Sequence, residues 1–547
     1  MLPIRPRLLS RPALRLLGLA ALAVSLRLLF LHDFIKRSLF QANFVAGTDM
    51  QFLLHWARTI AEGDALSRTV GVFWWAPFYP YTLATVLKMV GTGNVWPAAL
   101  AQDLLSAATA AALYVLGRRL LDETTALLAG LLAALYSPLI FYTGVFLSTT
   151  LEFFLAVLFL IVLTLARIRP RPFPWFTSGI VGALSCLARP NFLLGMFVIL
   201  LLIPVLLPRH DGRLDWKLSR TAWAAFVLGL VLVILPVTTR NLVIGGRLVL
   251  ISAAGPETFR IGNSYDSTPV NFIYPRQPMM PLTSTAFWRH QARKAVLFWS
   301  ALEVPQNISY YLAREESWVL GLPLLNFWLA VPLAAVGLWA TRRNARELLH
   351  VYAFLAAYYV SVVVFFVIAR WRLPLITPLL LFSAAGLLAV WRNVREHYWT
   401  RTGVQLFCAA GIGVAIFPWN ATYIFPADHG ELGYILANQG RYAEAVPRLA
   451  LAAAGFPSNG VLQRDLGTIL VRLGRLEDAR PHLERAAVSL PDDPRTHRDL
   501  GRVLAETCGD AARAGLHLQR YLALSPGAAD REAIEAVLLR LKRVAAP

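Results

Sequence analysis

The chain has 547 residues, of which 57% are hydrophobic and only 15% are charged, and its formal net charge is +20. A soluble globular domain is usually about a quarter charged, so this composition excludes an ordinary soluble enzyme and favours a membrane protein. The basic residues gather at the ends of apolar runs, as in the cytoplasmic loops of membrane proteins, so we expect no nucleic-acid partner.

The chain opens with a basic segment, MLPIRPRLLSRPALR, and an apolar run that reaches about Leu31. This run is longer than the apolar core of a cleaved signal peptide, so we predict an uncleaved first span with a cytoplasmic N-terminus. The stretch from Pro174 to Pro208 is long enough for two short helices and too long for one. About eleven spans are predicted in all: 13–32, 96–116, 122–140, 145–166, 174–188, 190–207, 222–241, 320–340, 348–368, 373–391 and 403–420.

Basic residues follow every second span when the N-terminus is placed inside, as the excess of Lys and Arg in cytoplasmic loops requires. These residues are Arg118, Arg119, Arg167, Arg169, Arg171, Arg209, Arg213, Lys217, Arg220, Arg342, Arg343, Arg346, Arg392, Arg395 and Arg401. An odd number of spans then predicts that the long loops 33–95 and 242–319 and the C-terminal part are exoplasmic. We expect a multi-pass protein of a bacterial inner membrane.

Four arginines depart from this bias, because Arg189, Arg240, Arg370 and Arg372 lie at the predicted outer ends of spans. Charges at membrane depth need partners, and a guanidinium matches the oxygen atoms of a lipid phosphate. The alternative is that these side chains snorkel to the interface. Snorkelling is the simpler explanation for a single arginine, whereas for Arg370 and Arg372 together with Arg189 both explanations stay open.

The first outer loop contains Asp49 at the start of an apolar-periodic stretch, in which Phe52, Leu53, Trp56 and Ile60 share one helical face. We predict an amphipathic helix in the plane of the interface, with Asp49 at its N-cap position. Two roles remain open for this carboxylate. It caps the helix, or it faces the mouth of the bundle, where it deprotonates an acceptor or holds a metal.

The order of six segments resembles the GT-C membrane glycosyltransferases, specifically the family 39-like bacterial proteins related to protein O-mannosyltransferases and aminoarabinose transferases. The resemblance covers most of residues 10–420 and includes the motifs Asp49 with HWARTIAEGD, APFYPYTLA, LYSPLIFYTGVFLS, LARPNFLL, RNLVIGGRLVLISAAGPETFRIGN and RWRLPLITPLLL. It implies an all-α bundle of GT-C type that takes a polyprenyl-phosphate-linked sugar laterally from the membrane and inverts the anomeric centre. No nucleotide sugar is implied as donor.

By position, the resemblance implies Asp49 as the catalytic residue at the reaction centre and Arg370 and Arg372 as ligands of the lipid phosphate. Further substrate-binding candidates are Arg189, Arg240, His55, Glu152 and Asn263. Many relatives carry an acidic pair where Asp49 is followed by Met50, and a Leu-Ser-Glu where this chain has Thr149 after Ser148. These departures remove possible metal ligands and leave the activity itself open. We therefore predict no metal site and keep a divalent metal as the alternative.

The second outer loop, 242–319, contains Glu257, His290 and several aromatic residues. Its segment GPETFRIGNSYDSTP is rich in turn formers, so this loop is predicted to fold over the acceptor. A single Glu or His in such a loop is more often structural than catalytic.

The C-terminal part repeats every 34 residues, because Leu-Gly pairs stand at positions 432, 466 and 500. This period resembles the tetratricopeptide repeat, a helix–turn–helix unit that stacks into an α-solenoid. We predict a membrane domain over 1–425 and an exoplasmic repeat domain over 426–547. The latter has about three repeats at 428–526 and a capping helix at 530–543. Such a surface usually binds a protein or peptide partner.

Together these features favour a membrane glycosyltransferase acting on an exoplasmic acceptor, either a protein or a cell-envelope glycan or lipid. The alternative is a catalytically inactive scaffold that presents the repeat domain for envelope assembly. A transporter is disfavoured, because the polar residues gather in outer loops, whereas transport sites lie near the middle of the bilayer.

Overall fold

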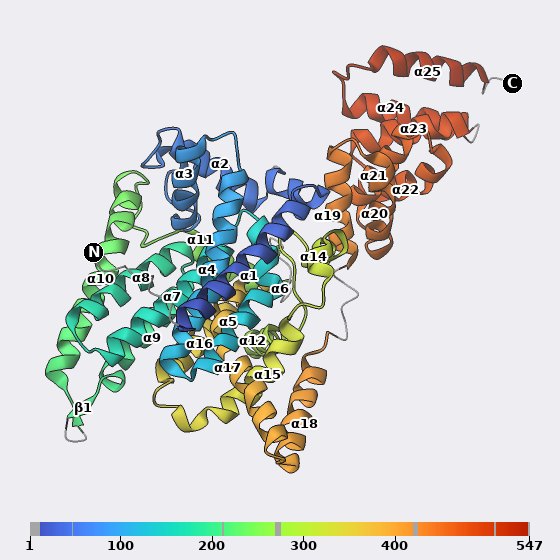
Figure 1. The fold of residues 1–547 in the computed structure, drawn as a ribbon. Coiled ribbons are helices and arrows are strands. Elements are labelled where there is room, and N and C mark those ends of the chain that lie inside the picture. Colours follow the sequence, from blue (N-terminus) through green and yellow to red (C-terminus); the bar gives the residue numbers. More distant parts are fainter. Residues whose placement is uncertain are drawn as a thin grey trace, which may run out of the picture. The chain divides into compact units, whose positions relative to one another are not determined.

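The computed structural model describes residues 11–45, 48–210, 213–267, 275–418, 425–507 and 510–544. The chain divides into two compact units, Met1–Pro418 and Trp419–Pro547, and each is described by itself. Both units are built from helices, as Figure 1 shows. The strands that the described residues form are limited to the short pair β1 (Arg209–His210) and β2 (Arg213–Leu214). The predicted all-α class is confirmed.

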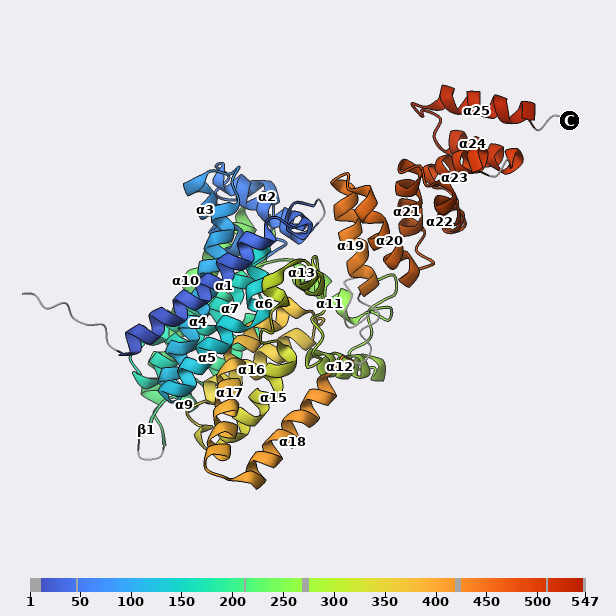
Figure 2. The same cartoon turned by 45° about the vertical axis from the view of Figure 1, so that its right-hand side comes forward.

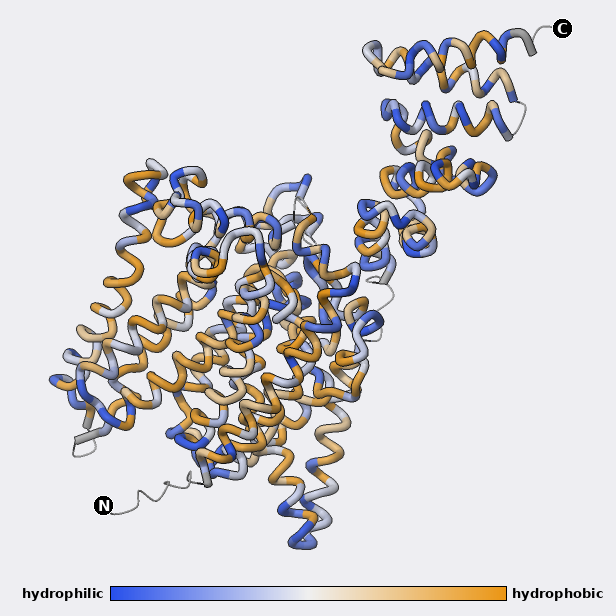
Figure 3. Tube along the Cα trace, turned by 45° about the horizontal axis from the view of Figure 1, so that its top comes forward, coloured by the Kyte–Doolittle hydropathy of each residue, from blue (hydrophilic) through white to orange (hydrophobic). Residues whose placement is uncertain are grey.

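Helices occupy every predicted span of the first unit. Five are long and apolar enough to cross a membrane: α1 (Arg11–Phe34), α4 (Trp96–Leu120), α7 (Thr149–Ile168), α10 (Trp216–Val243) and α17 (Ala369–Arg395). Shorter apolar helices are α5 (Glu123–Leu135), α8 (Pro172–Ala188), α9 (Phe192–Leu206), α15 (Phe327–Ala340) and α16 (Leu349–Val363). The last predicted span is α18 (Trp399–Ile416). Apolar residues dominate these helices in Figure 3, and the chain is a helical membrane protein.

Helix α17 forms the centre of this unit. In its apolar stretch of 18 residues 78% is buried, compared with 22% in the corresponding stretch of α10. It contacts α5, α7, α15, α16 and α18. The helix begins at Ala369, four residues before the predicted span at 373, so Arg370 and Arg372 belong to its first turn.

Glycines allow two helix pairs to approach closely. A Cβ atom at Gly337 of α15 would lie 1.7 Å from the carbonyl oxygen of Phe382 on α17, and Gly386 meets α15 in the same way. Gly179 of α8 and Gly229 of α10 form a second contact of this kind. Small residues at helix contacts are typical of packing in membranes, where close approach of the backbones replaces the hydrophobic effect.

Short helices form the two long loops of the unit. The first loop contains η1 (Ser38–Phe44), α2 (Asp49–Ala61), η2 (Arg68–Val70) and α3 (Phe78–Val90). The second contains α11 (Ala254–Asn263), α12 (Thr285–Phe298), α13 (Tyr310–Glu316) and α14 (Trp318–Gly321). Between α5 and α7 lie α6 (Ser137–Phe141) and η3 (Tyr142–Gly144), and η4 (Arg342–Asn344) follows α15.

The predicted helix after Asp49 is α2, and its apolar face, including Leu53, Trp56 and Ile60, is buried. The prediction that Asp49 is the N-cap of this helix is wrong by one residue. Thr48 is the N-cap, because its hydroxyl accepts a hydrogen bond from the backbone N–H of Gln51, whereas Asp49 is the first helical residue. The carboxylate of Asp49 is therefore not needed to cap the helix.

The second unit consists of helix pairs in chain order, and Figure 2 shows their stacking. They are α19 (Phe425–Asn438) with α20 (Tyr442–Gly455), α21 (Gly460–Arg472) with α22 (Leu476–Ser489), α23 (Pro494–Thr507) with α24 (Ala511–Leu524), and then α25 (Arg531–Val544). Gly440 and Gly474 end the first helix of a pair with φ of +75° and +73°, a conformation that costs glycine little. The repeat architecture is confirmed.

Candidate active site

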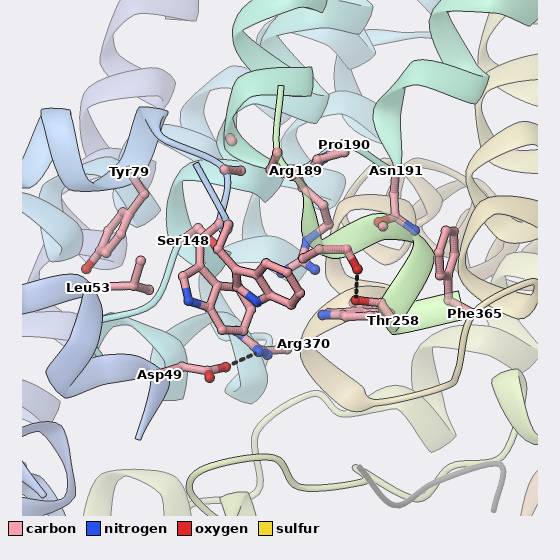
Figure 4. Close-up of a pocket in the computed structure, with 18 of the residues that line it drawn as sticks. Asp49, Leu53, Tyr79, Ser148, Arg189, Pro190, Asn191, Thr258, Phe365 and Arg370 are labelled. Atoms are coloured by element: carbon pink, nitrogen blue, oxygen red, sulfur yellow. Dashed lines mark hydrogen bonds and ion pairs between the residues drawn. The ribbon is translucent and has the colours of Figure 1, made fainter. Parts of the chain in front are cut away.

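A cavity of about 290 Å³ lies where α2, α8, α9, α11 and α17 meet (Figure 4). The side chains around it combine two arginines and one carboxylate with several aromatic rings. Its lining residues are Asp49, Leu53, Trp74, Trp75, Ala76, Tyr79, Ser148, Ala188, Arg189, Pro190, Asn191, Leu193, Ser252, Ala254, Gly255, Thr258, Phe365, Arg370 and Trp371.

Asp49 and Arg370 form an ion pair in this cavity, with 2.7 Å between Oδ2 of Asp49 and Nη2 of Arg370 (Figure 4). Arg370 also donates from Nε and Nη2 to Oε1 of Gln306, at 2.9 and 2.8 Å. Asn307 donates its Nδ2 to the same Oδ2 of Asp49, at 3.0 Å. Both donors thus use Oδ2, and within the described chain no hydrogen bond to Oδ1 is formed.

Local structure explains why Asp49 and Asn307 can meet. Asp49 begins α2, where the helix dipole favours a negative charge. Asn307 has a φ of +68°, in the left-handed region that asparagine adopts more readily than most residues, and Gln306 bridges Ile308 across this turn. The turn brings the Gln306 and Asn307 side chains to Arg370 and Asp49.

A second pair of charges supports the other side of the cavity. Arg189 lies between α8 and α9 and donates its Nε and Nη2 to the two carboxylate oxygens of Glu152, at 2.5 and 2.8 Å. Ser148 donates to the same carboxylate at 2.5 Å, and the Arg189 guanidinium lies 5.0 Å from the centre of the Trp371 ring. Glu152 is fully buried behind Arg189 and does not line the cavity.

Arg372 points elsewhere. It donates to the backbone carbonyls of Phe298, Ser300 and Leu302 and forms an ion pair of 3.0 Å with Glu303. Burial raises the pKa of Glu303, and the neighbouring guanidinium opposes that shift. Arg372 therefore fixes the segment after α12 against α17, and it is not among the residues around the cavity.

Three other candidates also lie outside the cavity. Arg240 donates to the backbone carbonyls of Leu66, Ser67 and Gly71, so it holds the first outer loop. Asn263 donates to the carbonyls of Phe259 and Val364. His55 is on the exposed side of α2.

Lys294, which no sequence pattern indicated, is fully buried near the cavity. Its ammonium group contacts four oxygen atoms: the carbonyls of Gly262, Val364 and Phe365 at 3.2, 3.2 and 2.7 Å, and Oδ1 of Asn263 at 2.9 Å. Burial lowers the pKa of Lys294 to about 7. The contacts join α12 to α11 and to Phe365, whose side chain lines the cavity.

Sequence reasoning did not select Gln306 or Asn307 as site residues, since an amide pair in a long loop carries no periodic signal. Among the described residues no group of three or more His, Cys, Asp and Glu side chains is placed to hold a metal ion.

Two family models match this chain. A model described as dolichyl-phosphate-mannose-protein mannosyltransferase matches residues 75–238, and one described as tetratricopeptide repeat matches residues 436–502. These matches confirm the two resemblances drawn from the sequence. The first match includes Glu152 and Arg189, whereas Asp49 and Arg370 lie outside it.

Several solved structures are similar to this chain. The oligosaccharyltransferase of Archaeoglobus fulgidus in the apo form is 14% identical, with 79% of this chain and 59% of that chain covered and a TM-score of 0.44. AglB from Archaeoglobus fulgidus, in complex with an inhibitory peptide and a dolichol-phosphate, is 13% identical. The match covers 79% of this chain and 59% of that chain, with a TM-score of 0.43. MamA 41-end from Desulfovibrio magneticus RS-1 is 17% identical. The match covers 28% of this chain and 90% of that chain, with a TM-score of 0.19. This chain spans 59% of the length of the apo oligosaccharyltransferase, and no curated protein matches it.

Proposed function

We propose that the protein is an integral membrane glycosyltransferase that moves a sugar from a polyprenyl-phosphate donor to an exoplasmic acceptor. The main support is one observation: the Asp49 carboxylate and the guanidinium groups of Arg189 and Arg370 share one cavity. The match of residues 75–238 to a mannosyltransferase family agrees with this proposal.

In this proposal Arg370 and Arg189 bind the phosphate of the donor. Each guanidinium is already held by a carboxylate, Asp49 or Glu152, so it is oriented before a substrate arrives. A phosphate accepts charge-assisted hydrogen bonds from two such groups, and a guanidinium presents its donors in a planar fork that suits phosphate oxygens. The two cations also stabilise the negative charge that develops on the leaving phosphate.

Asp49 acts as the general base. The acceptor hydroxyl or amine attacks the anomeric carbon, and its proton passes to Oδ1 of Asp49. A bond forms between the acceptor atom and the anomeric carbon, while the bond from that carbon to the phosphate oxygen breaks. The polyprenyl phosphate leaves with the electron pair, and attack from the opposite side inverts the anomeric centre. Asn307 and Arg370 both donate to Oδ2, so Oδ1 is the oxygen that this proposal assigns to the proton.

The aromatic residues Trp74, Trp75 and Tyr79 line the same cavity and offer flat apolar faces to a sugar ring or an isoprenoid unit. The proposal further places the cavity and the repeat unit on the exoplasmic side, where the repeat surface receives a protein or peptide partner.

The function is tested with the full-length protein in liposomes. Wild-type protein should consume polyprenyl-linked sugar from a lipid extract of the source cells, whereas Asp49→Asn should not. His55→Gln, an exposed change on the same helix, is the matched control and should keep the wild-type rate. If Asp49→Asn keeps that rate as well, Asp49 is not the base. If the wild type consumes no donor and also fails to bind polyprenyl phosphate, the protein is a scaffold for its repeat unit.

A further inference from the structure

A second cavity lies at the other end of α7. Ser148, just before α7, faces the candidate active site, whereas Thr164, Arg167 and Ile168 near its C-terminus line a separate cavity of about 400 Å³. We call this the arginine cavity. Its lining residues are Arg119, Leu120, Thr164, Arg167, Ile168, Val205, Leu206, Leu207, Pro208, Arg346 and Glu347.

Three guanidinium groups and one carboxylate face the arginine cavity. Arg119 is in the last turn of α4, Arg167 is in the last turn of α7, and Arg346 precedes α16. Arg167 donates to the backbone carbonyl of Glu347. Within the described chain, Arg119 and Arg346 make no hydrogen bond or ion pair. The fold therefore gathers three cations from three elements with a single carboxylate, Glu347, among them, and this excess of positive charge favours an anionic ligand.

One wall of the arginine cavity is apolar. Ile168 is 54% exposed and Val205 is 40% exposed, and both stand beside the arginines. Leu206 and Leu207 continue this wall from α9. A free phosphate ion makes no favourable contact with an apolar surface. A phospholipid, in contrast, presents a phosphodiester and an acyl chain side by side. Basic pockets between spanning helices are a known type of lipid headgroup site.

A third cavity, lined by Arg342, Arg343, Arg392 and Arg401, is similar in charge. Most of its arginines already have partners. Arg342 lies 4.4 Å from the ring centre of Trp339, Arg392 pairs with Asp122 at 3.3 Å, and Arg401 lies 5.1 Å from the ring centre of Tyr398. Substitutions of arginines in this third cavity therefore serve as a matched control for the removal of positive charge.

We propose that the arginine cavity binds the phosphodiester headgroup of an anionic phospholipid, with Arg119 and Arg346 as its main ligands. The acyl chains lie along Ile168 and Val205. This site is separate from the candidate active site and does not depend on the proposed transferase activity.

The test measures lipid binding to the full-length protein in detergent by native mass spectrometry, using phosphatidylglycerol and phosphatidylcholine with the same acyl chains. The wild type should prefer phosphatidylglycerol. Arg119→Gln with Arg346→Gln should weaken its binding roughly 30-fold, because each cation near an anionic headgroup contributes about 1 kcal/mol. Arg342→Gln with Arg401→Gln removes the same charge elsewhere and should change binding less than about threefold. Thermal unfolding checks that both variants are folded.

If both double variants lose phosphatidylglycerol binding equally, the attraction is general and the proposed site is wrong. The proposal also fails if Arg119→Gln with Arg346→Gln binds phosphatidylglycerol as the wild type does. Inorganic phosphate distinguishes the sources of the ligand. If millimolar phosphate displaces phosphatidylglycerol from the wild type, the cavity is a phosphate site and the lipid assignment fails. Arg119→Lys with Arg346→Lys keeps the charge but not the planar fork, so it should show an intermediate loss.

Discussion

Arg370 and Arg372 are two residues apart on α17 and face opposite surroundings. Two helical positions are separated by about 200° around the axis. Arg370 accordingly reaches Asp49 in the cavity, whereas Arg372 donates to backbone carbonyls and to Glu303. Arg370 lines the cavity, whereas Arg372 fixes the segment after α12 against α17.

The two arginines should therefore behave differently when replaced. Arg372→Gln leaves Glu303 buried without its cation and should destabilise the protein by about 3–5 kcal/mol. Arg370→Gln should change stability much less, because Asp49 is partly exposed to the cavity and keeps its bond to Asn307. Binding of polyprenyl phosphate should fall at least tenfold in Arg370→Gln, as expected for loss of a charge-assisted pair. Thermal unfolding and lipid titration provide the two readouts, and the reverse pattern would contradict these assignments.

Substitutions at Asp49 and Thr48 separate the proposed catalytic role of the carboxylate from the capping of α2. Thr48→Ala removes the N-cap of α2 and should cost about 1 kcal/mol of stability while leaving some transfer. Asp49→Asn keeps the cap, so stability should hardly change, but transfer should fall by about 10²-fold or more through loss of the base. A fall in transfer for Thr48→Ala as large as that for Asp49→Asn would mean that α2 placement, rather than the carboxylate, limits the reaction.

Asn307 is expected to position Asp49. Asn307→Gly removes the amide but suits a φ of +68°, so the fold should be kept while transfer falls by roughly tenfold. Asn307→Ala also removes the amide and in addition should cost about 1 kcal/mol of stability from the left-handed backbone. Unfolding and transfer are measured for both. The assignment fails if Asn307→Gly transfers at the wild-type rate.

The buried Lys294 should make the stability of the protein depend on pH. Its pKa in the folded protein is about 7, whereas a free lysine has a pKa of about 10.4. Between these values the unfolded chain binds the extra proton, so the free energy of unfolding should rise as the pH increases from 7 toward 10. Lys294→Met should flatten this rise and destabilise the protein by about 2–3 kcal/mol, since its oxygen partners lose their donor. Unfolding at pH 7 and pH 9.5 tests this, and an equal slope in both proteins would refute it.

The orientation of the chain can be tested with reporters at the C-terminus. The alternation of basic loops predicts an exoplasmic repeat unit. A C-terminal alkaline phosphatase should therefore be active, and a fluorescent protein that matures only in the cytoplasm should stay dark. The opposite result would move the candidate active site to the cytoplasmic side and would remove the basis for an exoplasmic acceptor.

The sequence by itself determined the helical class, the positions of the spans and the 34-residue repeat. These features depend on local hydrophobic periodicity, which is legible in a single chain. Sequence reasoning also selected Arg189 and Arg370, because charges at predicted outer ends of spans are conspicuous. It selected Asp49 because this residue opens a predicted interfacial helix and matches a position in the family it resembles.

Only the tertiary structure decided which of these residues share a cavity. Arg370 and Arg372 are the same residue type two positions apart, and they meet different surroundings because both belong to the first turn of α17 and different segments pack on its two sides. The contacts of Asp49 with Asn307 and Arg370 span 258 and 321 residues of sequence. No local pattern records such contacts, since they form only when distant helices pack together. The same reason explains why Gln306, Asn307 and Lys294 became visible only in the folded chain.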